Sequence, residues 1–268
     1  MPFAKTHDGA RIYYEVSGSG PAILAGAPFT ATKHLLLPHA ASRYRDALAQ
    51  DYTVVLIDSV RGGGRSDRKY PTVFTPEVAA SDMLAVADAA GIARFAWLGF
   101  SWSSVIGIQL ALRSDRVTAL LCGGWSPIDG PYRETGQLAT KVSAMFPFRH
   151  LKRVRESTAM YQQIYGILAT WSLEEQRRDV GRIRCPKLLY IGDQDNMQKP
   201  FRVALADRVR ASESDLKALG WEVRWIPGAG HSIVARPARV LPILREFLES
   251  QKLKVTGDVA VDAKPPIK

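Results

Sequence analysis

The chain has 268 residues, of which 46% are hydrophobic and 23% are charged, so it is long enough to bury one large core in a single α/β domain. No apolar run reaches the roughly 18 residues that a membrane-spanning helix needs, and residues 1–8 lack the apolar core of a signal peptide. These features exclude a membrane span and predict a cytoplasmic protein. Cys122 and Cys185 show no metal or redox spacing and are expected to be buried free thiols.

The net charge of +10 raises nucleic acids and anionic surfaces as partners. However, the basic residues are dispersed, and no helix-turn-helix, zinc or RNA-binding pattern is present. We therefore expect a small-molecule substrate, with no nucleic acid and no membrane as partner, and interpret the charge as a solubilising surface. A mild attraction for anionic substrates is the alternative. The sequence leaves open whether the chain forms a homodimer.

The first third of the chain predicts several strands before the first long helix. Residues 3–17 alternate around the turn Asp8-Gly9, which is typical of a hairpin. Residues 22–25 and 53–58 are short apolar runs that are typical of buried strands. Thr75-Pro76 is a helix start, with a threonine N-cap and proline at the first helical position, and the helix is expected to end near Gly91.

The stretch 95–113 is the centre of the prediction. Residues 95–100 form an apolar strand, and an apolar helical pattern follows from Val105. Between them, Gly99 and Ser103 flank Ser101 with small residues, as a tight turn from strand to helix requires. Such a turn holds its middle residue in a strained conformation at the edge of the sheet, where the N-terminal N–H groups of the helix also point.

The second half of the chain returns to alternating strands and helices after one interruption. Residues 126–182 contain three prolines, several helical pieces and many basic residues. Because strands and helices otherwise alternate, we expect a mostly parallel sheet. The remaining predicted elements are strands at 117–122, 185–192 and 221–226, helices at 201–219 and 237–248, and a mobile tail at 251–268.

These motifs together resemble the α/β-hydrolase family, in its serine-nucleophile, small-cap branch of esterases, lactonases and perhydrolases. The residues that carry the resemblance are Gly99-Phe100-Ser101-Trp102-Ser103, Ala25-Gly26-Ala27-Pro28, Arg61-Gly62-Gly63-Gly64-Arg65-Ser66-Asp67, Gly192-Asp193-Gln194-Asp195 and Gly228-Ala229-Gly230-His231. The sequence departs from the family at three positions. Ala25 and Gly63 stand where histidine is common, and Ser103 stands where the family has glycine.

The resemblance implies an α/β fold with a mostly parallel, eight-stranded sheet, helices on both faces and a small helical cap. Residues 1–125 and 183–250 would form the core, and 126–182 would form the cap, inserted after the sixth strand. The glycine-rich loop 61–67 is interpreted as scaffold beside the site. A phosphate-cradling loop is the less favoured interpretation, because the lysine that follows the glycines in such loops is missing.

Three residues, Ser101, Asp195 and His231, are predicted to be catalytic. Each follows a predicted strand directly, and the carboxyl edge of such a sheet is where ligands bind. Serine needs a base to take its proton, and His231 in turn needs an acceptor on its other nitrogen, a role that we assign to Asp195. Asp193 is the rival acid, and Asp129 is a remote alternative.

The resemblance also implies the remaining parts of the site. The backbone N–H groups of Ala27 and Trp102 would bind the oxyanion. Phe29, His34 and Trp125 are predicted to line the substrate pocket. No metal and no organic cofactor are implied.

The predicted function is that of a carboxylic ester hydrolase, which cleaves a small ester, lactone or thioester through an acyl-enzyme on Ser101. Two alternatives stay open on these residues. A C–C bond hydrolase, a perhydrolase or a lyase would use the same triad, and a ligand-binding receptor would keep the triad with little turnover. The three departures from the family pattern give the receptor some weight, but the hydrolase is the predicted function.

Overall fold

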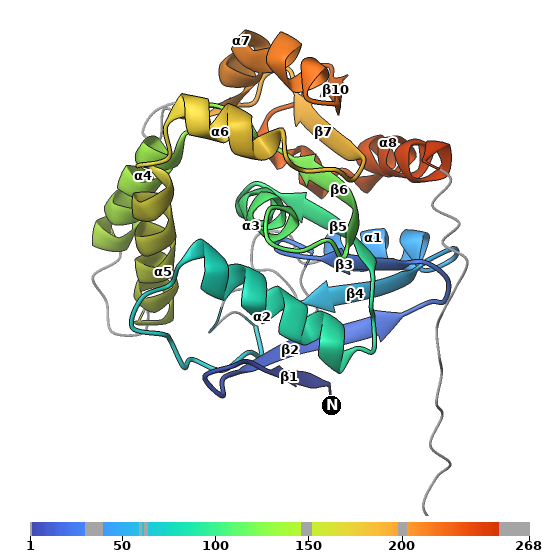
Figure 1. Ribbon diagram of the computed structural model, residues 1–268, viewed down its shortest axis with the longest axis vertical. Helices are drawn as coiled ribbons and strands as arrows, with labels where there is room; N and C mark the ends of the chain where they lie inside the picture. The colour runs from blue at the N-terminus through green and yellow to red at the C-terminus, as the bar shows by residue number, and fades with distance from the viewer. Residues whose placement is uncertain are drawn as a thin grey trace, which may run out of the picture.

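One eight-stranded sheet organises the computed structural model (Figure 1). The structure describes residues 2–29, 40–58, 61, 64–145, 152–197 and 203–251, and gives the backbone alone at 142–145, 152–158 and 197. The strands of the sheet are β1 Phe3–Lys5, β2 Arg11–Ser17, β3 Ala22–Ala25, β4 Thr53–Ile57, β5 Phe95–Phe100, β6 Val117–Gly123, β7 Lys187–Gly192 and β10 Trp221–Ile226. Their spatial order is β1-β2-β4-β3-β5-β6-β7-β10. Strands β1 and β2 pair antiparallel, as do β2 and β4, whereas every other neighbouring pair is parallel. The predicted fold class is therefore confirmed.

Helices cover both faces of this sheet. They are α1 Ala40–Leu48, α2 Pro76–Ala89, α3 Trp102–Ala111, α4 Tyr132–Met145, α5 Lys152–Leu168, α6 Leu173–Val180, α7 Leu205–Ala218, the short 3-10 helix His231–Ala235 and α8 Pro237–Ser250. Figure 1 shows α2 and α3 in front of the sheet and α1 behind it. Among the described helices, none combines the length and the apolar content that a bilayer crossing requires.

The apolar residues of the parallel strands divide between these two faces with a period of two. In β4, Val54 and Leu56 pack into the core shared with α1 and α8, while Val55 and Ile57 pack into the core shared with α2 and α3. Both faces of the strand are buried, which explains why its sequence is a continuous apolar run rather than an alternating one.

The predicted hairpin and helix start are both confirmed. Strands β1 and β2 pair around the turn that contains Gly9, whose φ of 80° suits glycine. Helix α2 begins at Pro76, and the Thr75 hydroxyl accepts a hydrogen bond from the Val78 N–H.

The helix predicted at 201–219 begins later than expected. Helix α7 begins at Leu205, and Val203–Ala204 instead form a short strand, β9, that pairs antiparallel with Asn196–Met197, β8. The β-branched Val203 is 2% exposed, and the strand pairing supplies backbone partners beside Asp195. The predicted tail falls almost wholly on 252–268, outside the described residues.

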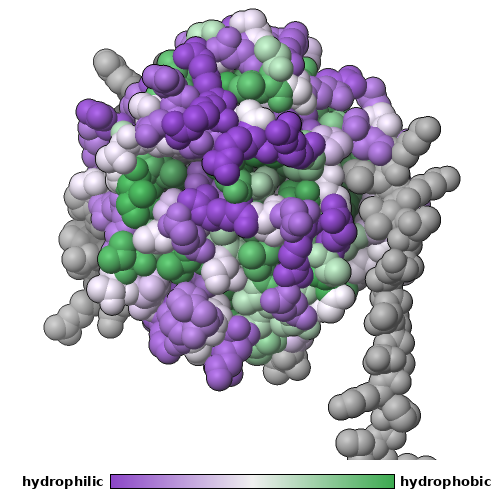
Figure 2. Space-filling view, viewed as in Figure 1, coloured by the Kyte–Doolittle hydropathy of each residue, from purple (hydrophilic) through white to green (hydrophobic). Residues whose placement is uncertain are grey.

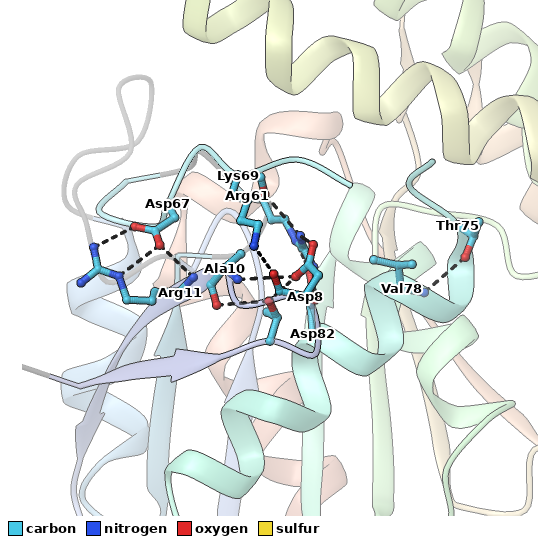
Figure 3. A network of polar contacts seen from close by, with 10 residues as sticks. Asp8, Ala10, Arg11, Arg61, Asp67, Lys69, Thr75, Val78 and Asp82 are labelled. Atoms are coloured by element: carbon cyan, nitrogen blue, oxygen red, sulfur yellow. Dashed lines mark hydrogen bonds and ion pairs between the residues drawn. The ribbon is translucent and has the colours of Figure 1, made fainter. Parts of the chain in front are cut away.

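Arg61 lies in a buried network of charges (Figure 3). The Arg61 side chain, 0% exposed, donates two hydrogen bonds to Asp82 of α2, at 2.8 and 2.9 Å, and one to Asp8 in the hairpin turn, at 2.5 Å. The hydrogen bond from Arg61 holds the pKa of the Asp8 carboxyl well below its usual value of 3.8. The network joins the first hairpin to α2, which supports the interpretation of the segment around Arg61 as scaffold.

Basic residues gather on the surface of α6. The space-filling view in Figure 2 shows a hydrophilic band over this helix. Arg177 forms an ion pair with Asp215 at 2.7 Å, and Arg178 and Arg182 both lie beside Asp179. All three arginine side chains are about half or more exposed, at 48%, 64% and 72%, which is typical of a solvated surface.

Candidate active site

Ser101 lies in the turn between β5 and α3, in a strained backbone conformation. Its φ is 54° and its ψ is −117°, outside the regions that residues with a side chain normally adopt. The turn is tight because a Cβ at position 99 would lie 2.5 Å from the Ser103 carbonyl oxygen, so only glycine fits there. The Ser101 N–H donates to the Gly123 carbonyl of β6 at 2.7 Å, which fixes the turn to the neighbouring strand.

His231 lies within hydrogen-bonding distance of Ser101, at the same edge of the sheet. It begins the 3-10 helix that follows β10, and its Nε2 lies 3.0 Å from the Ser101 Oγ. The Phe100 ring lies against the imidazole, with 5.0 Å between ring centroids. The His231 side chain is 28% exposed, so one edge of the imidazole reaches solvent.

Asp195 is buried and contacts the other ring nitrogen of His231. Its carboxylate is 0% exposed, and the His231 Nδ1 lies 3.0 Å from Oδ1 and 3.1 Å from Oδ2. Its backbone is fixed on both sides, because its N–H donates to the Gly192 carbonyl and its own carbonyl accepts from the Ala206 N–H. The structure thus places the three predicted catalytic residues in one hydrogen-bonded row.

The two rival acids lie elsewhere. The Asp193 carboxylate accepts from the Ala229 N–H at 3.3 Å, and the Asp193 carbonyl accepts from Arg210. Asp129 forms an ion pair with Arg208 at 2.7 Å, at a position with a φ of 53°. Among the described contacts of these two carboxylates, none involves His231, which favours Asp195 as its acceptor.

The two predicted oxyanion donors belong to neighbouring segments. Trp102 is the first residue of α3, where backbone N–H groups have no partner within the helix. Ala27 lies in the loop after β3, and its carbonyl accepts a hydrogen bond from the Ser103 hydroxyl. The loop carrying Ala27 is therefore hydrogen-bonded to the turn that carries Ser101.

The predicted substrate-lining residues are deeply buried where the structure describes them. Phe29 is 0% exposed and packs against the Tyr44 ring at 4.8 Å. Trp125 is 2% exposed and packs against Tyr132 and Tyr165. His34 lies outside the described residues. Contact of these three side chains with a substrate stays a prediction.

An aromatic cluster connects Trp102, the residue after Ser101, to α5. The Trp102 ring packs edge-on against Tyr161 at 4.2 Å and against Tyr165 at 5.4 Å. Burial raises the pKa of both phenols well above the usual 10. The spacing of four residues between the tyrosines, which puts both on one helix face, is the sequence signal for this contact.

The contacts of the Ser103 hydroxyl could not be predicted from the sequence, where Ser103 stands out only as a small residue beside Ser101. The hydroxyl accepts from the Phe100 N–H at 2.8 Å and donates to the Ala27 carbonyl.

In the described part of the chain, no three His, Cys, Asp or Glu side chains gather as metal ligands would.

Comparison with protein families gives one match that covers most of the chain. The model described as the alpha/beta hydrolase family matches residues 23–243, a range that includes all three residues of the hydrogen-bonded row.

Curated relatives match over shorter regions. A putative carbamate hydrolase RutD of Azorhizobium caulinodans is 33% identical over 144 residues, which cover 53% of this chain and 51% of that protein. The protein of the same name from Caulobacter vibrioides is 41% identical over 85 residues, or 31% of each chain. The chain thus spans about half or less of the length of the curated relatives it matches.

Solved structures share the fold over nearly the whole chain. A thermophilic esterase from Thermogutta terrifontis has a TM-score of 0.67 and 18% identity, covering 92% of this chain and 97% of that one. The enol-lactonase from Burkholderia xenovorans has a TM-score of 0.62 and 19% identity, covering 92% and 100%. At these identities, the likeness shows the fold alone.

Proposed function

The chain belongs to the alpha/beta hydrolase family, and we propose that it hydrolyses a small ester, lactone or thioester through an acyl-enzyme on Ser101. The observation that carries this proposal is the continuous row from the buried Asp195 carboxylate through His231 to the strained Ser101. A hydroxyl in hydrogen-bonding reach of a base, which is itself oriented by a third group, is the arrangement that activates a serine nucleophile.

Acylation begins with proton transfer from Ser101 to His231. With its Nδ1 proton donated to Asp195, the imidazole presents Nε2 as an acceptor, 3.0 Å from the hydroxyl. Oγ attacks the substrate carbonyl as its proton moves to Nε2, and the negative charge of Asp195 stabilises the imidazolium. The imidazolium then gives the proton to the leaving oxygen or sulfur, so the bond to the leaving group breaks and the acyl-enzyme remains.

Deacylation repeats the same steps with water. His231 takes a proton from a water molecule, the hydroxide attacks the acyl carbon, and the proton returns to Ser101 as the acid leaves. The backbone N–H groups of Ala27 and Trp102 would stabilise the negative oxygen in both steps. One such donor typically contributes about 3 kcal/mol.

The segment 126–182 would act as a cap over this site. Its helix α5 supplies Tyr161 and Tyr165, which pack on Trp102, the residue next to Ser101. Phe29, His34 and Trp125 would complete the apolar wall around the acyl group.

Carbamate hydrolysis is a second candidate, favoured by the name of the curated relatives, putative carbamate hydrolase RutD. The same row of residues would attack the carbamate carbonyl and form a carbamoyl-enzyme. Its slow step would be the release of the carbamoyl group, because the nitrogen lone pair lowers the reactivity of that carbonyl.

Matched p-nitrophenyl esters and carbamates separate these candidates, since both release the same chromophore. An ester hydrolase turns over short-chain esters steadily, but releases about one equivalent of p-nitrophenol from the carbamate and then stalls. A carbamate hydrolase turns over both. Ser101→Ala is the control and should abolish the burst. Lactones and thioesters are assayed as well. A folded wild-type protein that shows neither a burst nor turnover with any of these substrates would contradict the proposal and favour the receptor.

A further inference from the structure

Position 103 departs from the family pattern, and its side chain makes contacts that glycine lacks. Ser103 is 1% exposed. Its Oγ accepts from the Phe100 N–H at 2.8 Å and donates to the Ala27 carbonyl. The Oγ also lies 3.2 Å from the Phe100 carbonyl, so its one proton is directed to the closer Ala27 oxygen.

Among the described residues, three hydrogen bonds involve the loop that Ser103 contacts. The Gly26 N–H donates to the Leu98 carbonyl of β5 at 3.1 Å, and the Phe29 N–H donates to the Gly26 carbonyl at 3.0 Å. These two bonds hold the Gly26 end of the loop. The Ser103 hydroxyl donates to the carbonyl of Ala27, whose own N–H is the predicted oxyanion donor. This bond therefore holds the loop on the C-terminal side of that N–H.

A second departure from the family pattern lies at the start of this loop. Ala25 stands in place of histidine, and a methyl group donates and accepts no hydrogen bond. Ala25 is the last residue of β3, so this polar side chain is missing at the start of the loop, whereas Ser103 adds a hydroxyl on the turn.

We propose that Ser103 is a positioning residue for the oxyanion hole: its hydroxyl couples the loop carrying the Ala27 N–H to the turn carrying Ser101 and the Trp102 N–H. This inference rests on the proposed serine hydrolysis. Since Ser103 is buried, its hydroxyl would act through the backbone of the loop and not on the substrate itself. It fixes the spacing of two donors that lie on different segments, and misplacement of catalytic groups by about 1 Å can cost about 100-fold in rate.

The packing around Ser103 makes alanine the informative substitution. A Cβ built at Gly26 would lie 2.8 Å from the Ser103 Cβ, so loop and turn are already in close contact through carbon. Ser103→Ala keeps that carbon and removes only the hydroxyl. The Phe100 N–H and the Ala27 carbonyl then both lose this partner.

Ser104 offers a matched control in the same turn of helix. It is 0% exposed, and its Oγ donates to the Gly123 carbonyl at 2.9 Å and accepts from the Gly123 N–H at 3.0 Å. Ser104→Ala therefore removes the same number of buried hydrogen bonds. Those bonds reach β6 rather than the Ala27 loop.

The test compares wild type, Ser103→Ala and Ser104→Ala in three measurements. These are kcat and KM on the best p-nitrophenyl substrate, inhibition by a trifluoromethyl ketone that forms an oxyanion on Ser101, and the melting temperature. We expect Ser103→Ala to lower kcat about tenfold or more with KM within about twofold, and to weaken the ketone by a similar factor. Ser104→Ala should lower the melting temperature comparably while kcat stays within about threefold. Equal losses of kcat in both variants, or an unchanged kcat in Ser103→Ala, would overturn the proposal.

Hydrogen exchange gives a readout that needs no activity. In Ser103→Ala, the peptide that covers residues 22–29 should exchange faster than in wild type, whereas Ser104→Ala should leave it unchanged. If the wild type hydrolyses nothing and binds no ketone, the proposed function fails, and the exchange rates still decide whether Ser103 holds the loop. If Ser103→Ala does not fold, Ser103→Thr replaces it. Threonine keeps the hydroxyl, so the 22–29 peptide should stay protected, and faster exchange there would overturn the proposal.

Discussion

The two polar networks around Arg61 and Ser101 differ in how far their side chains are exposed to solvent. In the Arg61 network, the arginine and Asp82 side chains are 0% and 3% exposed, and the guanidinium is shared between two carboxylates. In the row at Ser101, the acid is equally buried, but His231 is 28% exposed and the serine backbone is strained. Burial of charge alone therefore does not mark an active site. The exposed imidazole edge and the strained backbone of Ser101 distinguish the second network.

The networks also differ in their place along the sheet. The Arg61 network joins the hairpin turn and α2, so it connects the antiparallel edge of the sheet to its helical layer. The Ser101 row lies just beyond the carboxyl ends of β5, β7 and β10, the edge at which open parallel sheets generally bind ligands. We expect substitutions in the first network to change stability, and substitutions in the second to change activity.

The largest expected effect is on activity. Asp195→Asn should lower kcat by about four orders of magnitude, because an amide fixes the wrong imidazole tautomer and cannot stabilise the imidazolium. Asp193→Asn is the control, and it should cost less than about tenfold, since the Asp193 carboxylate contacts the Ala229 N–H rather than His231. Steady-state kinetics on folded variants measures both. Comparable losses at the two positions would leave the acid unassigned, and a dominant loss at Asp129→Asn would transfer the role there.

The next effect is on stability. Asp82→Asn should lower the free energy of unfolding by roughly 3–5 kcal/mol. The substitution removes the negative charge whose two oxygens both accept hydrogen bonds from the buried Arg61 guanidinium. Glu77→Gln, on the same helix, breaks an ion pair with Arg113 whose acid is 64% exposed, and should cost less than about 1 kcal/mol. Urea unfolding measures both. Equal losses in the two variants would remove the distinction between the buried network and the surface pair.

The smallest effect is a pH dependence of stability. Since the hydrogen bond from Arg61 lowers the pKa of folded Asp8 from 3.8, this carboxylate stabilises the fold above about pH 4, and the contribution is lost as the pH falls further. Asp8→Asn should therefore be less stable than wild type at pH 7, by about 1 kcal/mol or more, with the difference shrinking below pH 4. Unfolding curves at several pH values measure the gap. A gap that is constant with pH would show that Asp8 acts through packing instead of charge.

Local sequence patterns predicted the sheet and the meeting of Ser101, Asp195 and His231. Each of those residues follows a recognisable strand, and parallel strands bring their carboxyl ends to one edge, so their proximity follows from topology. Their catalytic roles stay proposals. Three features were beyond such reasoning. The partners of Arg61 lie 53 and 21 residues away, Ser103 and Ala27 are 76 residues apart, and the β8–β9 pair depends on tertiary packing around Asp195.

The central claim is that Ser101 is an activated nucleophile, and covalent labelling tests it most directly. A fluorophosphonate should add to the native protein once per chain, with peptide mapping placing the adduct on Ser101. His231→Ala should slow the labelling strongly, while Asp82→Asn, measured under conditions where it is folded, should label at close to the wild-type rate. Labelling at another residue, or no labelling of the folded wild type, would contradict the claim.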